Sequence, residues 1–329
     1  MSQPLVSVIV PTHNDGVTLE RCVRSVQAQD WENIELLVID DGSTDGTAQL
    51  LESLRSSCPV LRTFALPSKS GAAAARNVGF REARGEIIAL IDGDMWAPPN
   101  WVSTLIAPLL SQEAEVTGGP DLVPPDSPLV SRCIGYSMDS LLTNAGLRKG
   151  DTRLVKYLPG TGNMAITRAS LQQAGSFDVS FHDTGEDKEW LHRVRESGAR
   201  CLYLPEALNW HERKPDLMLH ARKQLLSGRR RLDIVRKDPA AFELPHFMPS
   251  ILILFLLLCP AVAALRPLWW LTLAGGTAIV FIDCWRGSRQ IGSWKAFPIL
   301  LFSSPVIPFG YGLGILWRAL EVLTGRARA

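Results

Sequence analysis

The chain has 329 residues, 46% of them hydrophobic, and its 34 basic and 33 acidic side chains give a formal net charge of +1. This composition predicts a globular protein with a large core, and the weak net charge argues against nucleic acid as a partner. The six cysteines are scattered, without the spacing of a zinc site, and we expect them to be reduced.

Strand-like and helix-like segments alternate through the first 245 residues. Apolar runs occur at 5–10, 34–40, 60–66, 86–92 and 114–119. The four segments that separate these runs have the apolar spacing of amphipathic helices. This order predicts an α/β fold with a mostly parallel sheet and ligands at the carboxyl ends of its strands. The N-terminus has no basic region or cleavage site of a signal peptide, so we expect this part to be cytosolic.

Polar residues follow several of these strands. The second strand ends in "VIDDGSTDGT" (38–47), where Asp41 could accept hydrogen bonds from a ribose or a base, although the same residue types are common in turns. The fourth ends in "LIDGDMW" (90–96), in which Asp92 and Asp94 would repel each other unless they share a cation. Their oxygens suit Mg²⁺ or Mn²⁺ bound with a substrate diphosphate, but a single DxD is frequent by chance.

The order of motifs is more specific than any one of them. "VSVIVPTHND", "VIDDGSTDGT", "GAAAARNVG" (71–79), "LIDGDMW", "GTGNMAI" (160–166) and "GEDKEWLHRV" (185–194) together resemble the family 2 glycosyltransferases of the GT-A fold over about residues 5–215. The resemblance implies transfer of a sugar from a nucleotide diphosphate donor with inversion. It places donor contacts at Pro11, Thr12, Asp41, Arg76 and Asp92, the metal and diphosphate motif at Asp92 and Asp94, and the acceptor-activating base at Asp187.

Inverting transfer needs a carboxylate that takes the proton of the attacking hydroxyl group. Glu186 and Asp187 are adjacent at a helix start, so both cannot point at one acceptor, and we favour Asp187; acidic residues there also suit the helix dipole. His211 is predicted either to complete the metal site or to be an ordinary surface or core histidine.

The segment 220–239 is strongly basic and precedes an apolar region. It is predicted to be a solvated helix or a membrane-surface anchor. Gln224 and Arg229, together with "FGYGLG" (309–314), resemble the membrane-bound, succinoglycan-type branch of the family, which places these two residues near the acceptor or the membrane. The QxxRW motif of processive relatives is replaced by "QLLSGRR", which argues against processive polymerisation.

Three stretches without charged side chains follow, at 247–265, 267–282 and 296–317. Their length and the tryptophans near their ends predict membrane helices, whereas a buried soluble bundle is the less favoured interpretation. The middle stretch is short and the third contains prolines, so we expect two or three spans, the third being kinked or re-entrant. Three full spans would place Arg318, Arg326 and Arg328 outside, against the usual bias of basic residues.

We therefore expect a GT-A domain at 1–219, a basic interface region at 220–246 and a membrane segment at 247–329, located in the inner (plasma) membrane with the catalytic domain in the cytosol. The predicted reaction moves a hexose from a nucleotide diphosphate sugar to a lipid-linked saccharide during exopolysaccharide or envelope glycan assembly. A UDP-sugar is the first candidate donor, and polysaccharide assembly proteins are expected as further partners. The alternatives are a transferase that uses polyprenyl phosphate as acceptor and a non-catalytic envelope scaffold with the same fold.

Overall fold

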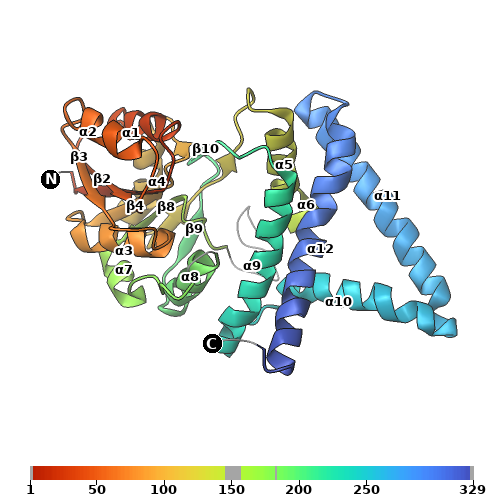
Figure 1. Cartoon of the computed structure of the whole chain (residues 1–329). Helices are drawn as coiled ribbons and strands as arrows, with labels where there is room; N and C mark the ends of the chain where they lie inside the picture. The colour runs from red at the N-terminus through yellow and green to blue at the C-terminus, as the bar shows by residue number, and fades with distance from the viewer. Residues whose placement is uncertain (1–2, 145–156, 182–183, 327–329) are drawn as a thin grey trace. The chain divides into compact units, whose positions relative to one another are not determined.

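The computed structural model describes residues 3–144, 157–181 and 184–326, so Arg328 lies outside the described residues. The described chain forms two compact units (Figure 1). The first contains 3–124, 157–181 and 184–212, and the second contains 125–144 and 213–326. Residues 125–144 therefore group with the C-terminal helices, although they lie inside the segment predicted as one domain.

The first unit alternates strands and helices as the apolar pattern predicts. Its strands are β1 (Val6–Thr12), β2 (Ile34–Asp40), β3 (Leu61–Ala65), β4 (Ile87–Ile91), β5 (Met95–Trp96), β6 (Val116–Gly118), β7 (Asp121–Leu122), β8 (Asn163–Thr167), β9 (Cys201–Tyr203) and β10 (Asn209–His211). Its helices are α1 (Leu19–Gln27), α2 (Thr47–Arg55), α3 (Ala72–Glu82), α4 (Trp101–Leu110), α7 (Arg168–Ala174) and α8 (Glu186–Glu196).

The main sheet has seven strands in the order β3-β2-β1-β4-β8-β6-β9, and β5, β10 and β7 form a smaller sheet. The strands β3, β2, β1 and β4 are parallel, and β8 runs antiparallel to both β4 and β6. Thr12 is in register with Asp40, and Ile9 with Leu90. The carboxyl ends of β1, β2 and β4 therefore lie next to one another, where ligands of such sheets bind.

Apolar side chains alternate between the two faces of this sheet. Val6, Val8 and Val10 of β1 belong to one core with apolar residues of α1, α2 and α4. Ile9 points to the opposite core, which includes residues of α3, α7 and α8. Because successive side chains of a strand point to opposite faces, the continuous apolar runs indicate a sheet covered on both sides.

The second unit is helical. It consists of α5 (Leu129–Asp139), α6 (Leu141–Asn144), α9 (Leu217–Lys237), α10 (Leu244–Leu258), α11 (Arg266–Ile291) and α12 (Ala296–Leu323), with 3₁₀ turns at Pro239–Ala241, Cys259–Ala261 and Ala263–Leu265. Within the described residues, three helical segments have the length and composition of membrane spans, Leu244–Ala261, Arg266–Ile291 and Ala296–Leu323.

The structure adds detail to two of these segments, and whether the third is kinked stays a prediction. The middle helix continues past Asp283, the first charged residue after its apolar stretch, and reaches 26 residues. The third is assigned as one α-helix that includes Pro305 and Pro308. The hydroxyl of Tyr136 and that of Ser140 donate to Asp283 Oδ1, at 3.1 and 2.7 Å. Hydroxyl groups of α5 and of the residue that follows it thus provide two hydrogen bonds to Oδ1 of Asp283, where α11 continues past its apolar stretch.

Candidate active site

A pocket of the first unit lies at the carboxyl ends of β1, β2 and β4, where the parallel strands predict one. It is lined by Pro11, Thr12, His13, Asp15, Asp41, Lys69, Gly71, Ala72, Ala75, Arg76, Asp92, Gly93, Asp94 and Glu186. Six of these residues were predicted to contact the donor or the metal, namely Pro11, Thr12, Asp41, Arg76, Asp92 and Asp94. The pocket brings them together with Glu186. The lining is rich in ionisable side chains, which is typical of a site for a charged ligand.

Asp41, at the tip of β2, holds the loop that leads into α3. Its Oδ1 accepts a hydrogen bond from the backbone N–H of Ser70 at 2.6 Å, and its Oδ2 accepts one from Gly71 at 2.8 Å. Gly71 has φ of 94°, a conformation that favours glycine. The carboxylate therefore fixes the wall of the pocket, and its contact with a donor stays a prediction.

The loop after β1 contributes a second set of polar groups. The Thr12 hydroxyl and the His13 N–H donate to Asp15 Oδ2, at 3.0 and 3.1 Å. His13 Nδ1 lies 2.8 Å from the backbone oxygen of Asp41. These contacts connect the tips of β1 and β2 and hold Thr12 at the pocket.

Arg76 is the buried cation of the site, and its side chain is 4% exposed. Its guanidinium donates to Asp92 Oδ1 at 2.8 Å and to Glu186 Oε1 at 3.3 Å. Burial opposes the charge, but Asp92 and Glu186 outweigh this and raise the pKa of Arg76. The arginine therefore stays charged and connects the DxD motif to the start of α8.

Two adjacent acids stand at the start of α8. Gly185 precedes the helix with φ of 95°, so the chain turns sharply into it. Glu186 lines the pocket, and burial raises the pKa of its carboxyl group, with Asp187 adding repulsion and Arg76 opposing the rise. Asp187 occupies the next position, and its Oδ1 accepts from the N–H of Lys188 at 2.8 Å. Glu186, the first residue of α8, thus contacts Arg76, and Asp187 follows it in the same first turn.

Asp94 meets His211 in the small sheet. β10 pairs with β5 in antiparallel register, with His211 opposite Met95, so the histidine reaches the residue just before β5. His211 Nε2 lies 3.2 Å from Asp94 Oδ2, and the buried Nδ1 has no hydrogen-bond partner within the described part of the chain. Among the residues that the structure describes, no three His, Cys, Asp or Glu side chains converge as a ready-made metal site.

Gln224 and Arg229 lie on α9, in the second unit. A Cβ at Gly310 of α12 would lie 3.1 Å from Cβ of Gln224. Arg229 Nη2 contacts both carboxylate oxygens of Glu321 at 2.9 Å, and its guanidinium lies 5.2 Å from the centre of the Trp317 ring. Both residues therefore make contacts to α12, and their predicted role at the acceptor or membrane stays open.

Three pocket residues with ionisable side chains were not predicted as site residues, namely His13, Asp15 and Lys69. His13 and Asp15 lie in the polar end of the first strand, and Lys69 lies in the loop that follows the third. The rule that ligands bind at the carboxyl ends of parallel strands, applied to every such loop, would have selected all three.

Comparison with known proteins identifies the family. The model of "Glycosyl transferase family 2" matches residues 7–171, half of the chain. The chain is 35% identical over 115 residues to "Glycosyltransferase GlyG" of Streptococcus pneumoniae, a match covering 35% of this chain and 38% of that one. It is 27% identical over 206 residues to "GalNAc(5)-diNAcBac-PP-undecaprenol beta-1,3-glucosyltransferase" of Campylobacter jejuni, covering 62% and 63%. The matches thus span less than two thirds of these two relatives.

Solved structures agree on the fold. The mannosyltransferase PcManGT from Pyrobaculum calidifontis, solved with GDP-Man and Mn²⁺, superposes with a TM-score of 0.62 at 21% identity and covers 99% of this chain and 89% of its own. TarS 1-349 of S. aureus, solved with UDP, gives 0.54 at 18% identity and covers 99% and 93%. These likenesses confirm the predicted GT-A fold. The family model, together with the motif order, establishes that the chain belongs to glycosyl transferase family 2.

Proposed function

We propose that the chain is a membrane-associated inverting glycosyltransferase that moves a hexose from a nucleotide diphosphate sugar to a lipid-linked saccharide. A UDP-sugar is the first candidate donor. The observation that carries the proposal is the arrangement of Arg76, which contacts both Asp92 of the DxD motif and Glu186 of α8 in one pocket. Pro11, Thr12 and Asp41 belong to the same pocket and are the proposed donor contacts, together with Arg76 and Asp92.

A divalent cation fits the residues around Asp94. The carboxylate of Asp94 offers hard oxygen donors beside the imidazole nitrogen of His211, and Asp92 adds a second carboxylate two positions earlier. Mg²⁺ and Mn²⁺ commonly take few protein ligands and complete their shell with phosphate oxygens and water, so an incomplete protein set suits them. Asp94, Asp92 and His211 would hold the ion, which would offset the charge of the departing diphosphate.

The proposed base is Asp187. Glu186 is committed to Arg76 by its contact at 3.3 Å, and through that arginine it is tied to the donor side of the pocket. Asp187 can then take the proton of the acceptor hydroxyl as its oxygen attacks the anomeric carbon and the bond to the diphosphate breaks. Glu186 also lines the pocket, and the pKa of its carboxyl group is raised, which suits proton transfer. Glu186 is therefore the alternative base.

A lipid-linked acceptor is favoured by two observations. The described chain contains three long apolar helices, and the C. jejuni relative is named for a PP-undecaprenol-linked saccharide. An acceptor held in the bilayer would explain why an apolar helical unit and a sugar-transfer domain share one polypeptide. We propose the plasma membrane as the location, with the catalytic unit in the cytosol, in an exopolysaccharide or envelope glycan assembly process.

Nucleotide release by the purified full chain, with membrane lipids as acceptor, tests the proposal. We expect release from one nucleotide sugar, dependence on Mn²⁺ or Mg²⁺, and a radiolabelled sugar in the lipid fraction. Asp92→Ala should abolish release, while Glu196→Gln, at the exposed end of α8, should not. No release from any donor would contradict the proposal. Transfer to polyprenyl phosphate alone would identify the alternative acceptor instead.

A further inference from the structure

Helix α12, the last of the three apolar helices, packs against α5, α9, α10 and α11 of its own unit. Its N-terminal half packs on α5, where Ser137 Oγ lies 2.7 Å from Ser303 Oγ and 3.1 Å from Ser304 Oγ. The thiol of Cys133 lies 3.9 Å from the backbone oxygen of Ala296. This side of α12 therefore contacts protein rather than lipid.

The C-terminal half of α12 packs along α9 with the two backbones in direct contact (Figure 1). A Cβ at Gly314 would lie 2.1 Å from the carbonyl oxygen of Leu225, and a Cβ at Gly228 would lie 1.9 Å from that of Tyr311. Only glycine fits at such distances. The "FGYGLG" motif thus has a physical reason, which is that it lets α9 approach α12 closely.

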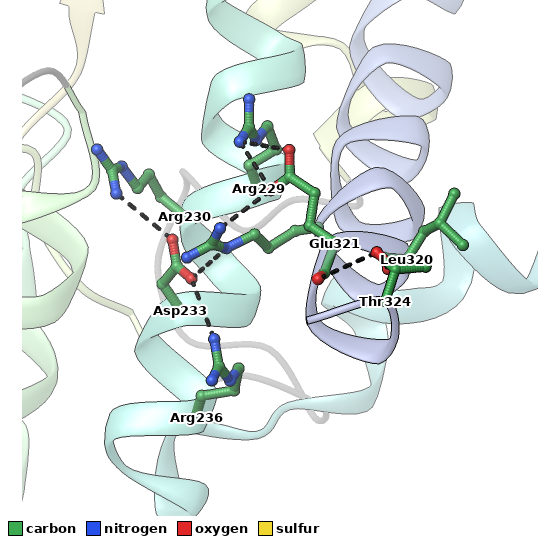
Figure 2. A network of polar contacts seen from close by, with 8 residues as sticks. Arg229, Arg230, Asp233, Arg236, Leu320, Glu321 and Thr324 are labelled. Carbon is green, nitrogen blue, oxygen red and sulfur yellow. Dashed lines mark hydrogen bonds and ion pairs between the residues drawn. The ribbon is translucent and has the colours of Figure 1, made fainter. Parts of the chain in front are cut away.

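Ion pairs continue this contact to the end of α12, as Figure 2 shows. Arg229 binds Glu321 at 2.9 Å, and Arg318 binds Asp233 at 2.7 Å. Arg230 and Arg236 approach Asp233 from the same helix, at 3.4 and 4.0 Å. Four arginines therefore surround two carboxylates, and the pair of helices is positively charged at this end.

Such a neighbour restricts where α12 can lie. Helix α9 carries seven Lys and Arg residues among its 21, and charged side chains in the hydrocarbon core cost several kcal/mol each. The face of α12 away from α9 and α5 instead presents an exposed apolar stripe at helical spacing, formed by Phe302, Phe309, Leu313 and Leu320. The pair of α9 and α12 therefore has a charged side, contributed by α9, and an apolar side, contributed by α12. Such an amphipathic pair suits the membrane surface.

We propose that α12 lies in the bilayer interface, beside α9, on the side of the membrane that carries the first unit, and that only α10 and α11 cross the hydrocarbon core. The chain leaves the first unit at Glu212 and enters α9 at Leu217, so α9 begins on that side. The apolar stripe of α12 enters the acyl region, and the excess arginines face anionic headgroups. The inference rests on the proposed membrane association but not on sugar transfer.

This arrangement also resolves the charge asymmetry of the sequence. With two crossings, the basic residues after α11 and those at the end of α12 share one side with α9. Arg289 and Lys295 lie on the cytoplasmic side with either two or three crossings, whereas Arg318 obeys the bias of basic residues toward that side only with two. The turn between α10 and α11 lies on the opposite side, where Trp269 and Trp270 suit the far interface.

The depth of α12 can be measured with nitroxide labels on the full chain in vesicles that contain anionic lipid. Single cysteines at Phe302, Phe309, Leu313 and Leu320 replace exposed side chains, and the unsubstituted chain reports labelling of its own cysteines. An interfacial helix gives a similar shallow depth at every position. A crossing helix gives a gradient of roughly 27 Å between 302 and 320, from a rise of about 1.5 Å per residue, and would overturn the inference.

Protease protection in sealed vesicles provides a second measurement. The chain carries one epitope tag at each terminus, and a third variant has a tag in the turn after Val262. We expect both terminal tags to be digested or protected together and the turn tag to behave oppositely. Terminal tags on opposite sides would overturn the inference alone. Release of the whole chain by an alkaline carbonate wash would overturn both the inference and the proposed membrane association.

Discussion

In the first unit, Arg76 is a single buried guanidinium between Asp92 and Glu186, whereas in the second unit four arginines surround Asp233 and Glu321. The pocket thus has more carboxylates than buried cations, and the pair α9 and α12 has more cations than carboxylates. A pocket with excess negative charge attracts a metal cation, while a pair of helices with excess positive charge attracts an anionic surface. The sign of the excess charge therefore distinguishes a site that binds from a surface that anchors.

The largest expected effect is on catalysis in the first unit. Asp187→Asn should lower kcat by about 10²–10⁴-fold, because it removes the proton acceptor while leaving donor contacts in place. Glu186→Gln should mainly weaken donor binding, because it releases Arg76. Steady-state kinetics and donor binding of both variants separate the two roles. If the Glu186 variant loses kcat and the Asp187 variant keeps it, Glu186 is the base.

In the second unit, the largest expected effect comes from the contact between helix backbones. Gly314→Leu should destabilise the protein by about 3 kcal/mol, because its side chain collides with the carbonyl of Leu225 and separates α12 from α9. Gly276→Leu in α11 is a matched control, since nothing lies within 4 Å of a Cβ there. Thermal unfolding in detergent measures both. Equal stability of the two variants would show that α9 and α12 are not closely packed.

Much of the first unit could be predicted because its signals are local. Continuous apolar runs marked the strands, and the parallel order placed Asp41 and Asp92 at one edge of the sheet. The contact of Arg76 with Glu186 joins residues 110 positions apart, and no spacing rule foretells such a pair. Likewise, the meeting of Asp94 and His211 depends on the pairing of two very short strands.

The second unit was predicted less completely for a physical reason. Hydropathy measures the composition of a helix but not its neighbours, so the third apolar stretch was predicted as a kinked or re-entrant segment because of its prolines. The contact of Gly314 with α9 and the pairing of Arg229 with Glu321 are tertiary features. Glycines at 310 and 314 give a signal for close helix packing, but the identity of the partner helix cannot be read from them.

Acid should weaken the second unit through His220 of α9. Burial lowers the pKa of this histidine from 6.5 to about 4, and Arg213 and Lys223 add repulsion. Between these values the unfolded chain binds a proton that the folded chain does not, so stability present above pH 6.5 is lost as the pH falls toward 4. From pH 7 to pH 5 we expect a loss of about 2 kcal/mol.

Unfolding of the full chain in detergent at both pH values measures this loss. His220→Gln cannot be protonated, so its stability should change less over the same range, whatever its absolute value. The first unit contains its own titrating groups, and comparison of the two proteins cancels their contribution. An identical pH response of both proteins would exclude His220 as the source.

The smallest expected effect compares an ion pair of each unit. Glu321→Gln should cost about 1–2 kcal/mol, because Arg229 and Arg318 lose a charged partner in a half-buried contact between two helices. Glu20→Gln in α1 removes an exposed pair with Arg24 and should cost less than about 0.5 kcal/mol. High salt should weaken the Arg24–Glu20 pair more than the ion pairs of Glu321, since exposed charges are screened more strongly. Equal costs in chemical unfolding would mean that the ion pairs between α9 and α12 are as solvated as an ordinary surface pair.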